Sequence, residues 1–229
     1  MFFIGGGSLV QHAIHFAQSI GLEVRGLCCP PGDPAGRGLR KTGLRVIESA
    51  APGAAVAKSL AALNGAPVFS INNKHLLDDQ LLSSGASFFN VHNGLIQKYR
   101  GLSEVCVFAA LCRNEEEYGV TLHRILPGQG VDSGSVVDQI EFDVMADDGF
   151  ADVMDQSLQA CRQIFEKNVR RIVQGEFESR VVRTAPKSFR YGDLAALYAR
   201  ADTDARKRAA ALGAYRPYFP RLQALVRTG

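Results

Sequence analysis

Residues 87–101 read SFFNVHNGLIQKYRG, and this stretch decides how the rest of the sequence is interpreted. It begins with an apolar run typical of a buried strand, and the run breaks at Asn93-Gly94, a pair suited to a turn with positive φ. Asn90 and His92 stand two positions apart near the end of the predicted strand, so both side chains project from the same face. An amide is thereby predicted beside an imidazole that can hold or move a proton near neutral pH.

A second segment adds a carboxylate. Residues 120–123 predict a strand, and residues 127–134 read PGQGVDSG, a tight loop rich in glycine. Asp132 is the one carboxylate in that loop. Taken singly, such an asparagine, histidine or aspartate is more often structural than catalytic. Their order along the chain, together with the blocks around them, favours a shared site.

At these residues the chain resembles the formyltransferase family that uses 10-formyltetrahydrofolate. The family pattern is N-x-H-x-S-L-L-P-x-x-x-G, then G-x-T-x-H, then D-x-G. Residues 90–101, 119–123 and 132–134 follow this pattern in the same order. The resemblance covers residues 68–139 and extends more weakly to the N-terminus. Several separate blocks in order are far more specific than a lone glycine motif.

The chain departs from the family pattern at two positions. Gln97 stands where the family has proline, and Gly94 stands where it has serine. We expect the loop beside the site to differ in shape, because proline would fix its φ angle. The departure bears on the choice of substrate more than on the chemistry.

The resemblance implies that the chain moves a formyl group from the folate to a primary amine. The amine would attack the formyl carbon directly, and a tetrahedral oxyanion would form. Asn90 and protonated His92 would donate hydrogen bonds to that oxyanion. Asp132 would orient His92, favour its charged form and take the proton that the amine loses, through a water molecule. This chemistry requires neither a covalent nucleophile nor a metal.

The resemblance also implies binding residues. The formyl donor would be 10-formyltetrahydrofolate, and its predicted contacts are Lys74, His75, Leu76, Gly128, Gln129 and Gly130. The amine substrate is predicted to contact Gly6, Gly7, Ser8, Asn93 and Gly94. By itself, His75 is more often a surface or packing histidine. His123 is expected to be a structural hydrogen-bonding residue beside the site.

The first residues predict a strand, a glycine turn and a helix. Residues 1–4 form the predicted strand, residues 5–8 read GGGS, and residues 9–20 form the predicted helix. Free backbone N–H groups and the helix dipole make such a turn an anion site. The turn lacks the G-x-G-x-x-G dinucleotide pattern. It is similar to the phosphate-binding first loop of glycinamide ribonucleotide formyltransferases, but tight packing of helix on sheet explains it equally well.

Predicted strands and helices alternate along most of the chain. We expect an α/β, Rossmann-like fold with a mostly parallel twisted sheet flanked by helices. Residues 150–173 predict a long amphipathic helix whose apolar stripe belongs to the core. We expect residues 1–175 to form a catalytic domain. Residues 176–229 would form a short, partly helical extension, which is basic because it holds 11 Lys and Arg against 5 Asp and Glu.

Shorter segments are predicted from local signals. Residues 54–64 and 76–84 predict helices, whereas residues 29–36 predict a loop because proline and glycine are dense there. In the extension, residues 193–200 and 204–212 predict helical pieces, and a proline-broken aromatic segment follows them.

Composition excludes several classes of protein. The chain has 229 residues and a net charge of +3, enough for one α/β domain with a full core. No apolar run approaches the roughly 20 residues that span a bilayer, and the N-terminus lacks the features of a signal peptide. Five cysteines without a C-x-x-C pair predict buried reduced thiols. We therefore expect a cytoplasmic enzyme without a nucleic-acid, membrane or metal partner.

The sequence leaves the amine open. The favoured substrate is an amino-sugar nucleotide, or an amino acid that is free or bound to a carrier protein. Methionyl-tRNA is disfavoured, because the 54 residues after Gly175 are too few for the C-terminal barrel of those enzymes. The alternatives are a glycinamide ribonucleotide formyltransferase-like enzyme, a formyltetrahydrofolate hydrolase and a non-catalytic folate-binding or interaction module. The basic extension suits a pyrophosphate, an acidic carrier protein, a homodimer contact or a solvated surface.

Overall fold

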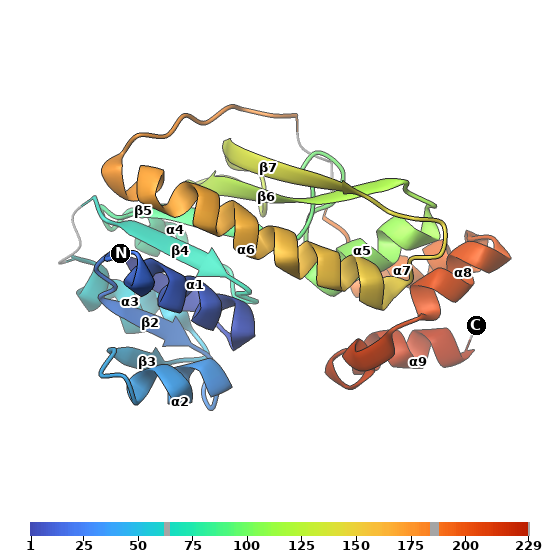
Figure 1. The fold of residues 1–229 in the computed structure, drawn as a ribbon, viewed down its shortest axis with the longest axis horizontal. Coiled ribbons are helices and arrows are strands. Elements are labelled where there is room, and N and C mark those ends of the chain that lie inside the picture. Colours follow the sequence, from blue (N-terminus) through green and yellow to red (C-terminus); the bar gives the residue numbers. More distant parts are fainter. Residues whose placement is uncertain (62–64, 184–187, 229) are drawn as a thin grey trace. The chain divides into compact units, whose positions relative to one another are not determined.

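Helices and strands alternate through most of the protein (Figure 1). The structure is a computed structural model that describes residues 1–61, 65–183 and 188–228. The strands are β1 (Phe2–Gly5), β2 (Gly26–Cys29), β3 (Val46–Glu48), β4 (Pro67–Ile71), β5 (Ser87–His92), β6 (Glu117–Ile125) and β7 (Val136–Asp143). The helices are α1 (Gly7–Ser19), α2 (Pro34–Arg40), α3 (Pro52–Ala61), α4 (Asp79–Leu82), α5 (Ser103–Cys112), α6 (Phe150–Gln174), α7 (Tyr191–Arg200), α8 (Thr203–Ala210), the 3-10 helix η1 (Gly213–Tyr218) and α9 (Pro220–Thr228).

The strands form one sheet in the order β3-β2-β1-β4-β5-β6-β7. The strand pairs from β3 to β5 are parallel, whereas β6 runs antiparallel to β5. Parallel neighbours need crossover connections, and helices α1 to α4 lie in those connections. The mixed, mostly parallel sheet with its flanking helices confirms the predicted α/β, Rossmann-like fold.

One face of the parallel strands carries stacked phenylalanines. Phe3, Phe69 and Phe89 are register partners on β1, β4 and β5, and successive ring centroids lie 5.7 and 5.6 Å apart. Phe165 of α6 packs edge-on against Phe69 at 5.1 Å, and Phe16 of α1 packs against Phe165 at 6.5 Å. Helix α1 and the C-terminal half of α6 therefore cover this face (Figure 1). Aromatic rings packed in this way bury a large apolar area.

The opposite face of the same strands carries Asn90 and His92. Helices α3 and α4 pack there against a cluster that includes Phe2, Ile4 and Phe88. Because side chains alternate along a strand, Asn90 and His92 lie on the same face as Phe88. The apolar part of β5 is thus anchored in the core, and its last residues are polar where the strand ends.

The loop predicted over residues 29–36 is confirmed at residues 30–33 and wrong at its ends, because β2 includes Cys29 and helix α2 begins at Pro34. Asp33 caps the helix by accepting the N–H of Ala35 at 2.9 Å, and proline suits the first helical position. Gly36 is required within the helix, since a Cβ there would lie 2.5 Å from the Sγ of Cys29. The glycine that lowers helix propensity in the sequence therefore allows close packing.

Two predicted helices have different bounds in the structure. Helix α4 is short and begins after Asp78, whose carboxylate accepts the N–H of Leu81 at 2.7 Å. The residues between β4 and Asp78, which include the start of the predicted helix, form a turn instead. Helix α3 begins at Pro52 and ends at Ala61. The remainder of that predicted helix, residues 62–64, lies outside the described residues.

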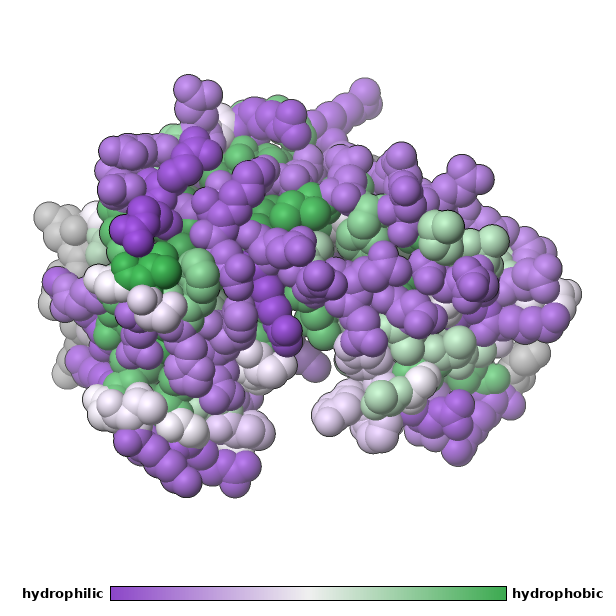
Figure 2. Space-filling model, viewed as in Figure 1, coloured by the Kyte–Doolittle hydropathy of each residue, from purple (hydrophilic) through white to green (hydrophobic). Residues whose placement is uncertain are grey.

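Helix α6 confirms the predicted amphipathic pattern. Its predicted apolar stripe lies in the core and consists of Met154, Leu158, Cys161, Phe165, Val169 and Ile172. The outward side of the helix is largely hydrophilic (Figure 2). The stripe therefore serves packing and not cofactor binding.

The described chain forms two compact units. The first comprises residues 1–92, 121–138 and 161–182, and the second comprises residues 93–120, 139–160 and 183–229. In the second unit α5 packs against α7 and α8, with the rings of Phe108 and Tyr198 5.6 Å apart. Helices α7 and α8 confirm the predicted helical pieces, and the proline-broken aromatic segment forms η1 and leads into α9. The functional boundary at residue 175 stays a prediction.

All five cysteines are free and buried, as predicted. Burial raises the pKa of the Cys28 and Cys29 thiols to about 11 and that of Cys112 and Cys161 to about 12. These side chains are therefore thiols and not thiolates at neutral pH. Within the described ranges, no helix is both long and apolar enough to cross a bilayer, and no group of His, Cys, Asp or Glu is placed to hold a metal ion.

Candidate active site

A row of polar side chains crosses the sheet at the end of β5. Asn90 is the register partner of Ser70 on β4 and of His123 on β6. His92, the last residue of β5, faces Thr121 in the same register. Neighbouring strands lie about 4.8 Å apart, so residues paired in this way have adjacent side chains. The two-residue spacing of Asn90 and His92 thus places both on one polar face, as the sequence predicts.

Asp132 completes the cluster. Its Oδ2 lies 3.6 Å from His92 Nδ1, its Oδ1 accepts a hydrogen bond of 3.2 Å from Asn90 Nδ2, and the same Oδ1 lies 3.5 Å from His123 Nε2. The side chains of His92, His123 and Asp132 are 5, 3 and 9 % exposed. A carboxylate so shielded from water needs cationic or hydrogen-bonding partners, and Asn90 and His92 face it in that role.

The backbone around Asp132 explains why a glycine-rich loop holds it. Asp132 has φ of +47°, a left-handed conformation that aspartate tolerates better than most residues. At Gly134 a Cβ would lie 1.6 Å from the carbonyl oxygen of Arg124, so only glycine allows this approach to β6. Arg124 also donates its N–H to Ser135 at 2.9 Å. The loop is therefore fixed against the strand that carries His123.

The two ring nitrogens of His123 have different neighbours. Its Nδ1 lies 3.0 Å from the Arg124 carbonyl oxygen, which only accepts, so Nδ1 must carry the proton. Its Nε2 then accepts from Asn90 Nδ2 at 3.2 Å. This agrees with the expectation that His123 is a structural hydrogen-bonding residue beside the site. Because this Nε2 accepts from Asn90, His123 does not donate a hydrogen bond to Asp132, although the two atoms lie 3.5 Å apart.

The amide of Asn90 has two hydrogens, and both are directed into the cluster. One is donated to Asp132 and the other to His123. In this arrangement Asn90 fixes the Asp132 carboxylate and the His123 imidazole relative to each other. The oxyanion role implied by the family resemblance therefore requires one of these hydrogens to be redirected, and it stays a prediction.

Ser70 and Asn73 join the row and were not singled out in the sequence. Ser70 is 5 % exposed, and its Oγ lies 3.4 Å from Asn73 Nδ2. Asn73 also donates to the carbonyl oxygen of His75 at 2.9 Å and accepts its N–H at 3.0 Å. The side chain of Asn73 thus shapes the turn after β4. A single hydroxyl within the apolar strand, followed by two asparagines, was the available signal.

The predicted donor-binding segments lie beside α4. Lys74, His75 and Leu76 are exposed in the turn that precedes this helix. The residues of the second segment, Gly128, Gln129 and Gly130, lie between β6 and β7 and are also exposed. Gly128 donates its N–H to Asp79, the first residue of α4, at 3.0 Å. This bond fixes the second segment to the helix that follows the first. Leu76 is 78 % exposed and Val131 40 % exposed, which leaves an apolar side chain uncovered at each segment.

The predicted substrate-binding residues divide between the two units. Gly6 caps the start of α1, and Gly7 and Ser8 are its first two residues; the Gly7 N–H is donated to Asp33. Asn93 and Gly94 belong to the second unit. Asn93 is buried, its Nδ2 lies 3.6 Å from the Met154 sulfur, and its carbonyl accepts from Tyr118 at 3.0 Å.

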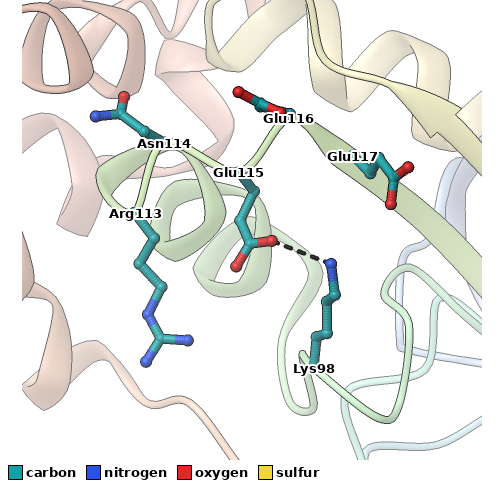
Figure 3. Close-up of a pocket in the computed structure, with 6 residues that line it drawn as sticks. All are labelled: Lys98, Arg113, Asn114, Glu115, Glu116 and Glu117. Atoms are coloured by element: carbon teal, nitrogen blue, oxygen red, sulfur yellow. Dashed lines mark hydrogen bonds and ion pairs between the residues drawn. The ribbon is translucent and has the colours of Figure 1, made fainter.

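A surface depression lies within the second unit at the turn between α5 and β6. It is lined by Lys98, Arg113, Asn114, Glu115, Glu116 and Glu117 (Figure 3). Lys98 and Glu115 face each other and form an ion pair of 3.2 Å (Figure 3). The Arg113 guanidinium lies over the Phe189 ring at 4.9 Å. None of the predicted catalytic residues lines this depression, and its two cations already have partners.

Comparison with known families identifies the chain. The family model described as formyl transferase matches residues 45–169, more than half of the chain. The protein belongs to the formyl transferase family. The matched range contains Asn90, His92 and Asp132, so the resemblance first seen in three short blocks is confirmed, and the protein is an enzyme of the formyltransferase class.

Solved structures share the fold of this formyltransferase. A sugar N-formyltransferase from Shewanella sp. FDAARGOS_354 aligns with a TM-score of 0.72 at 14 % identity over 91 % of this chain and 87 % of that one. An N-formyltransferase from Helicobacter canadensis, in complex with folinic acid and dTDP-3-aminofucose, aligns with a TM-score of 0.65 at 17 % identity over 82 % and 70 %. Glycinamide ribonucleotide transformylase 1 from Symbiobacterium toebii aligns with a TM-score of 0.68 at 21 % identity over 79 % and 92 %.

Proposed function

We propose that the protein is an N-formyltransferase that moves the formyl group of 10-formyltetrahydrofolate to a primary amine of a small molecule. The observation that carries this proposal is the buried cluster in which Asp132 faces both His92 and Asn90 at the end of β5. It combines a group that exchanges protons with a carboxylate and an amide donor, which are the parts that acyl transfer to an amine needs. Membership of the formyl transferase family adds to this support.

The proposed reaction gives each of these groups a role. The amine nitrogen attacks the formyl carbon, and the carbonyl oxygen becomes an oxyanion that protonated His92 stabilises. Asp132 accepts the proton that the amine nitrogen sheds, through a water molecule. The bond from the formyl carbon to N10 of the folate then breaks, and N10 takes up a proton from His92. Asp132 passes the proton that it accepted on to His92, so both groups return to their starting forms. No bond to the protein forms at any step.

The folate donor fits the two segments beside α4. An aromatic pterin has flat apolar faces, and Leu76 and Val131 offer uncovered apolar side chains in those segments. The backbone of Lys74–Leu76 and of Gly128–Gly130 would provide the polar contacts that orient the ring. The solved N-formyltransferase from Helicobacter canadensis was obtained with folinic acid, a related folate.

The amine is proposed to be an amino-sugar nucleotide, with a free or carrier-bound amino acid as the alternative. Sugar N-formyltransferases are among the structures with the same fold, and one was obtained with dTDP-3-aminofucose. Glycinamide ribonucleotide is the second candidate, because this chain aligns with 92 % of one such transformylase. Contact of the basic extension with a carrier protein or with a second copy of the chain stays a prediction.

Release of tetrahydrofolate tests the proposal. The purified protein is incubated with 10-formyltetrahydrofolate and a panel of amino-sugar nucleotides, glycinamide ribonucleotide and amino acids, and the formylated product is identified by mass spectrometry. Turnover that depends on one class of amine is the expected result. Turnover in water alone would indicate a formyltetrahydrofolate hydrolase, and folate binding without turnover would indicate a binding module.

A further inference from the structure

The turn between β1 and α1 has the form of an anion site but already contains an anion. A strand, a glycine turn and a helix N-terminus generally direct free N–H groups and the positive end of the helix dipole at one point. Here the Gly7 N–H donates to both carboxylate oxygens of Asp33, each at 3.1 Å. Gly7 has φ of +74°, so the chain is bent at the residue that makes this contact. The carboxylate therefore occupies the position at which such a turn generally directs a bound anion.

Asp33 is held in this place from a second direction. Its Oδ1 also accepts the N–H of Ala35 at 2.9 Å and caps helix α2. The carboxylate cannot leave the turn without uncapping that helix. At Gly6 a Cβ would lie 2.4 Å from Asp33 Oδ2, so the glycine is needed for the carboxylate to approach. The glycine run therefore accommodates a side chain of the protein itself.

Asp33 adds negative charge to its surroundings. Burial is the main cause that raises the pKa of Cys29 to about 11, and the charges of Asp33 and Glu48 add to it. Glu48 lies at the end of the neighbouring strand β3, where Arg40 forms an ion pair with it at 3.1 Å. The Asp33 carboxylate has backbone N–H groups as its partners, and its charge is therefore not neutralised by a cation among its described contacts.

We propose that Asp33 is a specificity-determining residue that closes this turn to phosphate. A phosphate monoester carries up to two negative charges and would have to displace, or lie against, a fixed carboxylate. The amine substrate therefore presents no phosphate monoester at this turn, which disfavours phosphoribosyl amines and favours amines without such a group. The conclusion about the amine rests on the proposed function, whereas the exclusion of phosphate does not.

Titration with inorganic phosphate tests the exclusion without any assay of activity. Amide resonances of Gly7 are followed by NMR in the intact protein, with chloride of equal ionic strength as the reference. The wild type is expected to show no saturable shift. Asp33→Ser keeps a capping hydroxyl for α2 and removes the charge, and it should bind phosphate at least about tenfold more tightly than the wild type. Asp33→Asn keeps the shape and provides a second test if the serine variant does not fold.

Asp78→Ser is the matched control. Asp78 caps α4 in the same way, by accepting a backbone N–H, but it does not contact the Gly7 amide. Its replacement should leave phosphate binding unchanged. Saturable binding of phosphate at Gly7 in the wild type would overturn the proposal, and so would folded Asp33 variants that gain no phosphate binding.

A competition experiment tests whether the preferred amine substrate lacks a phosphate monoester. The wild-type enzyme is offered an amino-sugar nucleotide together with glycinamide ribonucleotide. Formylation of the sugar amine alone is expected, and preference for glycinamide ribonucleotide would overturn the substrate conclusion. If no amine is formylated, the proposed function fails while the phosphate titration still decides the role of Asp33.

Discussion

Two aspartates of the first unit lie in loops that follow strands of the sheet, Asp33 after β2 and Asp132 after β6, but their partners differ in kind. Asp33 accepts backbone N–H groups of Gly7 and Ala35. Asp132 faces the side chains of His92 and Asn90. Backbone N–H groups neither take nor release a proton, so Asp33 is confined to holding the turn and setting its charge. An imidazole can exchange a proton, so the same functional group at Asp132 can take part in chemistry.

The largest expected effect is on catalysis. Because His92 and Asp132 exchange protons in the proposed reaction, His92→Ala or Asp132→Asn should lower kcat by about 10²–10⁴-fold. Tetrahydrofolate release under saturating substrates measures the effect. His15→Ala is the control, since His15 is exposed on α1, and it should retain the wild-type rate. Wild-type rates from either site variant would remove the cluster from the mechanism.

The second expected effect is on the free energy of unfolding, and it differs between variants of Asp33 and Asp132. Asp33→Ala removes the cap of α2 and leaves the Gly7 N–H without its acceptor, so the free energy of unfolding should fall by about 1–3 kcal/mol. Asp132→Asn keeps an acceptor of the same shape and should change that free energy by less than about 1 kcal/mol. Urea unfolding measures both. A larger loss of stability at Asp132 than at Asp33 would reverse the assigned roles.

A smaller effect is expected at Ser70, which links the row to the turn after β4. Ser70→Ala removes the acceptor of the Asn73 amide, and a neutral hydrogen bond of this kind contributes about 0.5–1.5 kcal/mol. The KM for the folate donor should therefore rise by about two- to tenfold while kcat is retained. The matched control is Ser84→Ala, because the buried Ser84 hydroxyl has no hydrogen-bond partner among the described residues. Equal effects of both variants would contradict a role for Ser70.

The smallest effect is electrostatic and concerns Cys29. Its pKa is raised to about 11 by burial and then by Asp33 and Glu48, whereas that of Cys28 is raised by burial and by Cys29. Asp33→Asn should lower the pH at which Cys29 is alkylated and leave Cys28 almost unchanged, as read by mass spectrometry. A change in the alkylation pH of both thiols, or of neither, would contradict the negative charge that Asp33 is assigned.

The same thiols predict how stability depends on pH. Their folded pKa lies above the ordinary value of 9.0, so the protonated thiol is favoured by folding. This contribution is fully present below pH 9.0 and is lost as the pH rises through about 11. Replacing Cys28 with alanine should therefore reduce the loss of stability over that interval in thermal unfolding.

The sequence predicts the polar residues at the end of β5 better than it predicts the contact of Asp33 with the turn between β1 and α1. Asn90 and His92 follow from the two-residue period of a strand, and Asp132 follows from a glycine-rich loop in the family pattern. Asp33 escapes this reasoning because its partners are backbone groups of a distant segment, which leave no pattern of side chains. Ser70 escapes it because a lone serine in an apolar strand becomes informative only when the register sets it beside Asn90.

Helix bounds show the same limit. The long stripe of α6 is evident from its period, because packing along the whole helix repeats the signal. Helix α2 is hidden by its glycines, which allow close packing at Cys29 that the sequence alone does not reveal. A capping aspartate followed by proline was present at residues 33–34, and it is the local signal that identifies the start of this helix.

The rate of the double variant tests most directly whether His92 and Asp132 act as one unit. The quantity to measure is kcat/KM for wild type, His92→Ala, Asp132→Asn and the combination, with the same donor and amine. Residues that move one proton together lose their function together, so the double variant should be no slower than the slower single variant. Losses that multiply in the double variant would contradict the account, because they would show that the imidazole and the carboxylate work independently.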